Sequence, residues 1–306
     1  AWQPGRCTVT EPVAAMNMCK LAATQMLALV GFTVREARNK WTLVALFTLT
    51  TLFLLALATL VSVDVVEGSI ASARLFGTIP LEIGNTTIPI SDAVTVIQVA
   101  IVYLLTTFGL VLALFVTGNI VPLTLQTGWV DLLASQPMAR TVLIVGRALG
   151  AAAVVAVTFA YLFGGSWTVL TWKTGFGNAG FLLAGLVILF TFLCCYSGMV
   201  LIGVLTRNSP ISIIAGVGTW FLGLILYPLH AYDQWTTAFR LGWQRSLATG
   251  IAETLYWILP KSLELTENAT KATRAEPLAW LPFLTSMPFA IVSIALACWW
   301  FSRQDY

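Results

Sequence analysis

The chain has 306 residues, of which 58% are hydrophobic and only 9% are charged. Soluble domains carry roughly 25% charged residues, so this composition excludes an ordinary water-soluble fold. The net charge of +3 is too small to form the basic stripe of a nucleic-acid-binding protein. The apolar residues instead gather in runs of about 20, the length of a helix that crosses a bilayer.

A helix near the N-terminus, at residues 15–33, is predicted to lie at the membrane surface. Residues 15–33 are apolar and helix-forming, but Asn17, Lys20 and Gln25 interrupt them, and residues 34–40 are strongly polar. Such a mixed segment suits the membrane interface better than the hydrocarbon core. We therefore divide the chain into an N-terminal segment with an interfacial helix at 1–40 and a transmembrane domain at 41–306.

Six apolar runs in this domain are predicted to cross the bilayer. They are helices, because a chain in lipid must satisfy its backbone hydrogen bonds internally and the runs lack the alternation of barrel strands. The predicted fold class is an all-α membrane protein with about six transmembrane helices. The runs are Trp41–Val61, Ala93–Val116, Thr141–Phe163, Phe181–Leu205, Ile211–Leu229 and Ala279–Phe301.

Basic residues near the ends of the runs predict the orientation. With a cytoplasmic N-terminus, the cytoplasmic side holds nine basic and four acidic residues, and the other side holds seven and nine. Both termini are therefore expected on the cytoplasmic side of the cell (inner) membrane. Ser62–Asp92, Gly164–Gly180 and His230–Leu278 become outside loops, and Thr117–Arg140 and Thr206–Pro210 become inside loops. The apolar aromatic stretch at 251–260 is interpreted as a surface or re-entrant helix within the last outside loop.

The sequence offers little support for chemistry of its own. Gly175-Phe-Gly-Asn-Ala-Gly180 has dinucleotide-loop spacing, but no strand precedes it, so we interpret it as a turn between helices. The P-loop pattern GxxxxGK[ST] is absent, and His230 is the only histidine. We expect no catalytic, cofactor-binding or metal site in this chain.

Polar residues inside the runs are few. Gln98, Tyr103 and Thr106 in the second run and Tyr196 in the fourth form a candidate substrate path, and hydrogen bonding between helices is the alternative explanation. No ionisable residue lies near the middle of a run, which argues against a proton- or sodium-driven carrier.

The third run contains two further signals. Arg147 lies about two turns inside it and is expected to extend its side chain to the cytoplasmic surface. Gly146 and Gly150 have the spacing that lets a second helix approach closely.

The inside loop Thr117–Arg140 carries a short amphipathic pattern. Pro122 suits a first helical turn, and Pro137 ends a helix. Between them, large apolar side chains recur at helical spacing. They belong to Trp129, Val130, Leu132 and Leu133. The pattern predicts a helix at the inner face of the membrane, either anchored in the interface or presented to the groove of a cytoplasmic partner.

This loop resembles a known family. Gly128-Trp-Val-Asp-Leu-Leu-Ala-Ser-Gln-Pro-Met-Ala-Arg140, continuing to Val145-Gly-Arg-Ala-Leu-Gly150, resembles type-2 ATP-binding-cassette (ABC) permeases. The nearest group is the one with the membrane subunit of the nitrous-oxide-reductase maturation transporter. In that pattern a Gly, an Asp, a Pro and an Arg recur at this spacing. Segments 34–40, 256–260 and 301–305 agree as well.

The resemblance implies a permease subunit for export or for transmembrane force transmission. It would pair with a second permease, the same or homologous, and would sit on two cytoplasmic ABC ATPases that bind ATP and Mg²⁺. The ATPase-coupling residues it implies are Gly128, Trp129, Val130, Asp131, Leu132, Leu133, Pro137 and Arg140.

Two departures and two alternatives remain at this stage. Trp129 replaces the usual Thr, and the acidic residue common upstream is missing from Leu123-Thr-Leu-Gln126. The alternatives to a permease are a non-transporting anchor or scaffold subunit of a larger complex and a secondary transporter.

Overall fold

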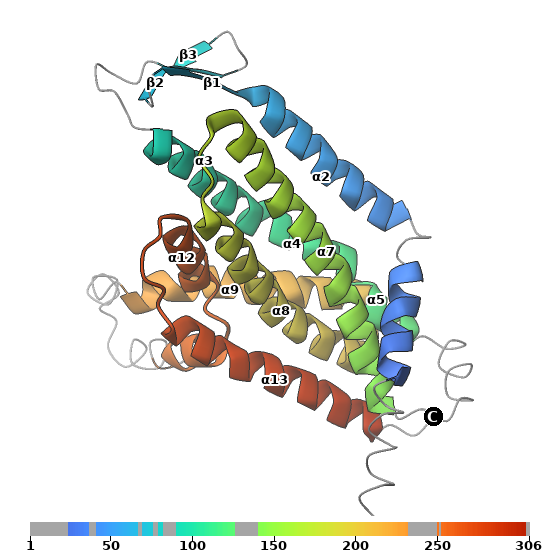
Figure 1. The fold of residues 1–306 in the computed structure, drawn as a ribbon. Coiled ribbons are helices and arrows are strands. Elements are labelled where there is room, and N and C mark those ends of the chain that lie inside the picture. Colours follow the sequence, from blue (N-terminus) through green and yellow to red (C-terminus); the bar gives the residue numbers. More distant parts are fainter. Residues whose placement is uncertain are drawn as a thin grey trace, which may run out of the picture.

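The computed structural model describes residues 24–36, 41–66, 69–75, 79–81, 90–125, 140–231, 250 and 252–303. Long helices dominate it (Figure 1). Two short helices cover residues 24–36 and 252–258. The other helices are α2 (Trp41–Leu60), α3 (Ile90–Leu104), the π-helix η1 (Leu105–Gly109), α4 (Leu110–Thr117), α5 (Ile120–Thr124), α7 (Arg140–Thr174), α8 (Ala179–Thr206), α9 (Ser209–Ala231), α12 (Ser262–Thr273) and α13 (Leu281–Ser302).

The helices confirm the predicted class of a multi-span helical membrane protein. Five of them are long and apolar enough to cross a bilayer, and the apolar part of α2, Val44–Thr59, is a shorter sixth. Each predicted run coincides with one of these helices. The second run is built from α3, η1 and α4, which follow one another without a break in helical structure.

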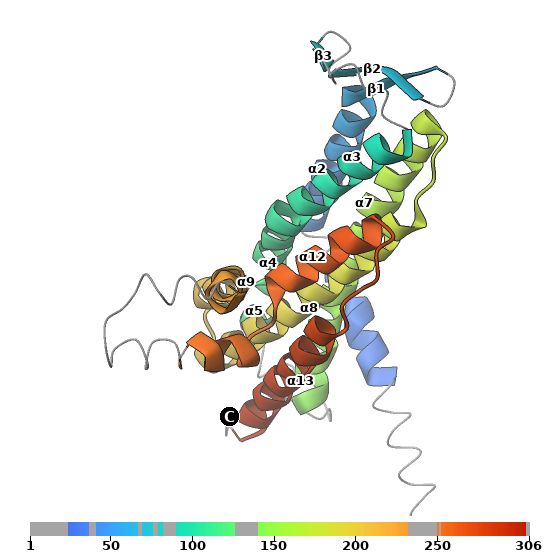
Figure 2. The same cartoon turned by 90° about the vertical axis from the view of Figure 1, so that its left-hand side faces the viewer.

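The bundle has two ends, which we name by what lies there. The Arg207 end holds the turn between α8 and α9, where Arg207 takes the left-handed conformation that ends α8. The sheet end holds a small β-sheet. Helix 24–36 and the last turn of α13 both lie at the Arg207 end (Figures 1 and 2). The helices between them therefore cross the bundle an even number of times.

The small sheet was not predicted. Strands β1 (Val61–Val66), β2 (Ser69–Leu75) and β3 (Ile79–Leu81) pair antiparallel in the order β1-β2-β3, with Val61 opposite Leu75 and Ala73 opposite Leu81. The alternating valines of VSVDVV are the only sequence signal, and a pattern this short is ambiguous.

The predicted outside loop Gly164–Gly180 is wrong over most of its length, because α7 continues to Thr174. Gly165 lies within this helix. A Cβ there would lie 2.6 Å from Leu54 Cδ1 of α2, so the missing side chain lets the two helices meet. Only the last part is the turn expected for the Gly175–Gly180 pattern. Gly175 has a φ of +72°, and Asn178 Oδ1 accepts a hydrogen bond from Gly180 N at the start of α8.

The predicted outside loop His230–Leu278 is also corrected, because α12 packs inside the bundle against α8, α3 and α9 (Figure 2). The residues of α12 are on average polar, yet most of them are buried. Two glycines make room for its ends. A Cβ at Gly223 of α9 would lie 2.7 Å from Ser262 Oγ, and a Cβ at Gly180 would collide with the Ala272 carbonyl oxygen.

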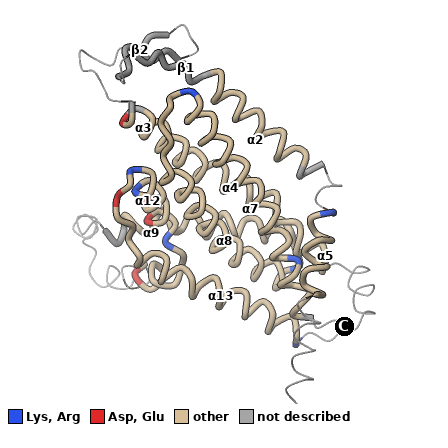
Figure 3. Tube along the Cα trace, in the orientation of Figure 1, with Lys and Arg blue, Asp and Glu red and all other residues tan. Residues whose placement is uncertain are grey.

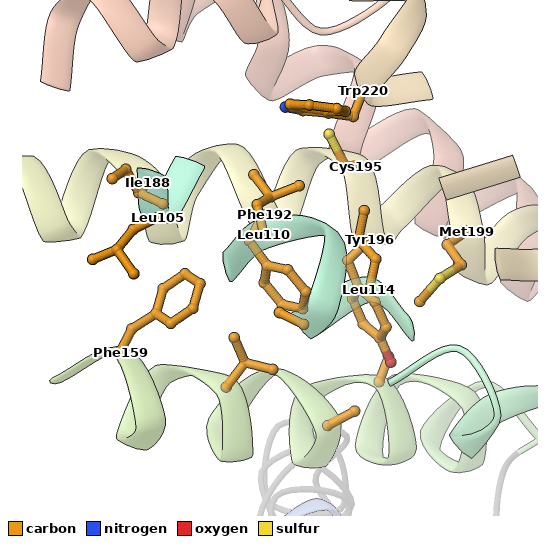
Figure 4. Packing of buried hydrophobic residues seen from close by; sticks show 14 of the residues in the cluster. Leu105, Leu110, Leu114, Phe159, Ile188, Phe192, Cys195, Tyr196, Met199 and Trp220 are labelled. Atoms are coloured by element: carbon orange, nitrogen blue, oxygen red, sulfur yellow. The ribbon is translucent and has the colours of Figure 1, made fainter. Parts of the chain in front are cut away.

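The core lies along α7 and α8. In α7, 72% of the membrane-length stretch is buried inside the chain, against 22% in α13, so α7 is central and α13 peripheral. Aromatic rings follow the interface of α7 and α8. Phe159 meets Phe192 at 6.3 Å between ring centroids, and Phe192 stacks on Tyr196 at 5.4 Å (Figure 4).

Candidate functional site

The predicted coupling segment connects α5 to α7. Residues 126–139 lie outside the described residues, so the structure does not place Gly128, Trp129, Val130, Asp131, Leu132, Leu133 or Pro137. Arg140 is the first residue of α7. Both helices that flank the segment, α5 and the first turns of α7, lie at the Arg207 end (Figure 1).

Helix 24–36 packs against the first turns of α7, which directly follow this segment in the chain. A Cβ on Gly146 would lie 2.9 Å from Leu29 Cβ, and a Cβ on Gly150 would lie 2.6 Å from Thr33 Cβ. The glycine pair therefore accepts two side chains that are themselves four residues apart. This confirms the predicted close approach, and its partner is the N-terminal helix of the same chain.

Arg147, between the two glycines, is almost completely buried, with 2% of its side chain exposed. It forms an ion pair with Glu36, and its guanidinium lies 4.9 Å from the centre of the Phe32 ring. The expectation that Arg147 extends its side chain to the surface is wrong. The reason is that helix 24–36 covers it and supplies the opposite charge.

The four residues of the candidate substrate path do not gather around one space. Gln98 is fully buried, and its Oε1 accepts a hydrogen bond from Asn178 Nδ2 at 2.9 Å. The buried Thr106 hydroxyl donates to the Val102 carbonyl at 2.7 Å. Tyr196 is buried with no hydrogen-bond partner for its hydroxyl among the described residues, while Tyr103 is 48% exposed. Gln98 thus forms a hydrogen bond between helices, which was the alternative explanation for the polar residues inside the runs.

An apolar groove of about 410 Å³ lies elsewhere, between residues 156–164 of α7 and 182–189 of α8. None of the four path residues lines it. Its lining has no side chain that would orient a polar substrate.

The structure reveals an ion pair inside the bundle that the sequence analysis missed. Lys261 is 3% exposed, and its Nζ lies 3.7 Å from Glu264 Oε1. The same ammonium lies 4.3 Å from the ring centre of Tyr256 and 4.5 Å from that of Trp257. Attraction between a cation and aromatic rings adds to the ion pair. The signal was present in the sequence as a lysine and a glutamate three residues apart, directly after the aromatic stretch 251–260.

The Tyr256 hydroxyl donates a hydrogen bond to Glu264, which completes the cluster. Burial and this bond to the carboxylate raise the pKa of Tyr256 above its ordinary value, so its phenol stays protonated and remains a donor.

Further contacts hold this cluster against two spans, α13 and α8. The Lys261 N–H donates to Ser286 Oγ of α13 at 3.1 Å, and Ser262 Oγ lies 4.0 Å from Cys195 Sγ of α8. Cys195 lies 16 residues into α8, which is about 24 Å along the helix axis. The start of α12 is therefore well inside the bundle.

Charge is otherwise scarce along the long helices, as Figure 3 shows. Within the described ranges, no three His, Cys, Asp or Glu side chains gather as a metal site. A scan of protein-family models and a search of curated proteins both find no match to this chain.

Proposed function

We propose that this chain is the permease subunit of an ABC transporter, which couples ATP hydrolysis by separate cytoplasmic subunits to export or to force transmission across the membrane. The observation that carries the proposal is the resemblance of residues 128–150 to type-2 ABC permeases. The connection of this segment to α7, the most buried span, supports it, since a push on the segment would act on the core.

The distribution of charge supports a cytoplasmic Arg207 end. Of the charged residues in the described ranges, five arginines and one glutamate belong to the Arg207 end, a net of +4. The described residues away from this end, which include the buried cluster around Lys261, have five basic and six acidic side chains, a net of −1. Excess positive charge marks the cytoplasmic side of membrane proteins. The proposed orientation puts both termini and segment 126–139 within reach of cytoplasmic ATPases.

The experiment that tests the proposal is purification of the intact assembly from native membranes, followed by identification of its subunits. We expect two ABC ATPase subunits and a second permease copy or homologue. The chain alone should not turn over ATP, because its sequence has no P-loop. ATP turnover by the isolated chain, or an assembly without any ATPase, would contradict the proposal.

A second candidate is an ion-coupled secondary transporter, which the buried Lys261–Glu264 pair favours. Such carriers place ionisable groups inside the bundle to bind the coupling ion. In this structure, however, the two groups neutralise each other. Substrate uptake that follows a proton or sodium gradient without ATP in reconstituted vesicles would favour this candidate over the first.

A further inference from the structure

The contact of helix 24–36 with α7 fixes both the position and the register of this helix. Leu29 and Thr33 lie against Gly146 and Gly150, so a slip along α7 would drive side chains into each other. Thr33 is 1% exposed and Leu29 is 7% exposed, as expected for residues in a close interface. A helix held only by the membrane surface would not need such close packing against α7.

The ion pair makes this contact obligatory. Arg147 lies seven residues into α7, about 10 Å along its axis. Without Glu36 its charge would be buried with no opposite charge among the residues that the structure describes, which is strongly unfavourable. Phe32, on the same helix as Glu36, covers the guanidinium from a second direction. Helix 24–36 and the first turns of α7 thus hold each other in place.

Segment 126–139 joins this unit at Arg140, two turns before Arg147. On the other side, residues 37–40 connect Glu36 to the start of α2, which also packs along α7. We infer that Glu36 and Arg147 form a latch that makes helix 24–36 and the first turns of α7 one rigid unit, and that this unit positions segment 126–139 for its partner. The positioning of segment 126–139 by this unit rests on the proposed function.

Docking of the helix is tested on the chain alone. Leu29→Cys combined with Gly146→Cys should form a disulfide on mild oxidation of membranes, detected by mass spectrometry of the joined peptides. Adding Glu36→Gln should lower its yield by about fivefold or more, the lower range of coupling between sites. The exposed neighbour Arg35→Gln is the matched control and should leave the yield unchanged. Equal yields in the Glu36 and Arg35 variants, or no disulfide at all, would overturn the latch.

A charge swap separates the latch from a general folding defect. Glu36→Arg with Arg147→Glu keeps the pair and should restore the disulfide yield, whereas each single reversal should not. If the swap behaves like the single reversals, the two side chains do not act as a pair and the inference fails.

Positioning is tested in the assembled complex. Glu36→Gln should leave recovery of the ATPase unchanged but lower stimulated ATP turnover by about fivefold or more, and the charge swap should restore it. Unchanged turnover would overturn the positioning role. If no ATPase is recovered with the unaltered chain, the proposed function and the positioning role both fail, while the disulfide result still decides whether the latch exists.

Discussion

Glycines at several positions allow the helices of this protein to pack closely. Gly223 and Gly218 both belong to α9, yet their surroundings differ. A Cβ on Gly223 would lie 2.7 Å from Ser262 Oγ and 2.8 Å from the Pro260 carbonyl oxygen, whereas a Cβ on Gly218 would have no neighbour within 4 Å. The two positions therefore form a natural test and control.

We predict that Gly223→Ala destabilises the protein and that Gly218→Ala does not. Overpacking of a tight contact costs about 1–3 kcal/mol, and here one neighbour is backbone that cannot rotate away. At Gly218 the added methyl group is neutral or slightly favourable, since alanine favours helix by about 1 kcal/mol over glycine. The unfolding temperatures in detergent should differ accordingly. Equal values for both variants would show that α12 is not seated on α9.

The Asn178 side chain forms three hydrogen bonds at the sheet end. Its Oδ1 accepts from Gly180 N, and its Nδ2 donates to Gln98 Oε1 and to the Thr273 carbonyl. Asn178→Ala removes a helix cap worth about 1 kcal/mol and leaves buried acceptors unpaired, at about 1–3 kcal/mol more. Thr168→Ala should have little effect, because that exposed hydroxyl bonds only within α7. Thermal unfolding measures both, and a similar shift in the two variants would contradict the role of Asn178.

The helices formed by long apolar runs were predicted from the sequence. All six runs are helices, because length and hydropathy alone suffice for that inference. The position of α12 was not predicted, since its polar composition resembles a surface loop and its burial depends on Gly180 and Gly223 far away in the chain. The pairing of Arg147 with Glu36 was missed for the same reason, as the two residues are 111 positions apart.

The packing of α12 along α8 gives a prediction of its own. Ser262→Cys should form a disulfide with the native Cys195, because Ser262 Oγ lies 4.0 Å from Cys195 Sγ. Arg274→Cys, in the exposed turn after α12, should not. Peptide mapping after oxidation distinguishes the two. If the Ser262→Cys variant forms no bond to Cys195 under conditions that oxidise other close pairs, α12 does not enter the bundle at this depth.

The arrangement of the helices predicts opposite sides of the membrane for two exposed positions, and the proposed orientation says which side is cytoplasmic. Asn208 lies in the turn between α8 and α9, and Glu276 lies between α12 and α13. In a background without reactive native cysteines, Asn208→Cys should react with an impermeant thiol reagent only from the cytoplasmic side, and Glu276→Cys only from outside. Labelling of both from one side would contradict the topology.

Coupling to a cytoplasmic ATPase is tested most directly at Leu132, in the segment that resembles the ABC permease loop. If the proposed ATPase binds this segment in a groove, Leu132→Asp removes apolar contact area worth about 1.5–3 kcal/mol and puts a charge in that groove. We predict normal membrane expression, reduced recovery of a cytoplasmic ATPase and reduced stimulated ATP turnover, with a weaker effect for Trp129→Ala. Unchanged ATPase recovery and turnover in both variants would contradict the assignment as an ABC permease.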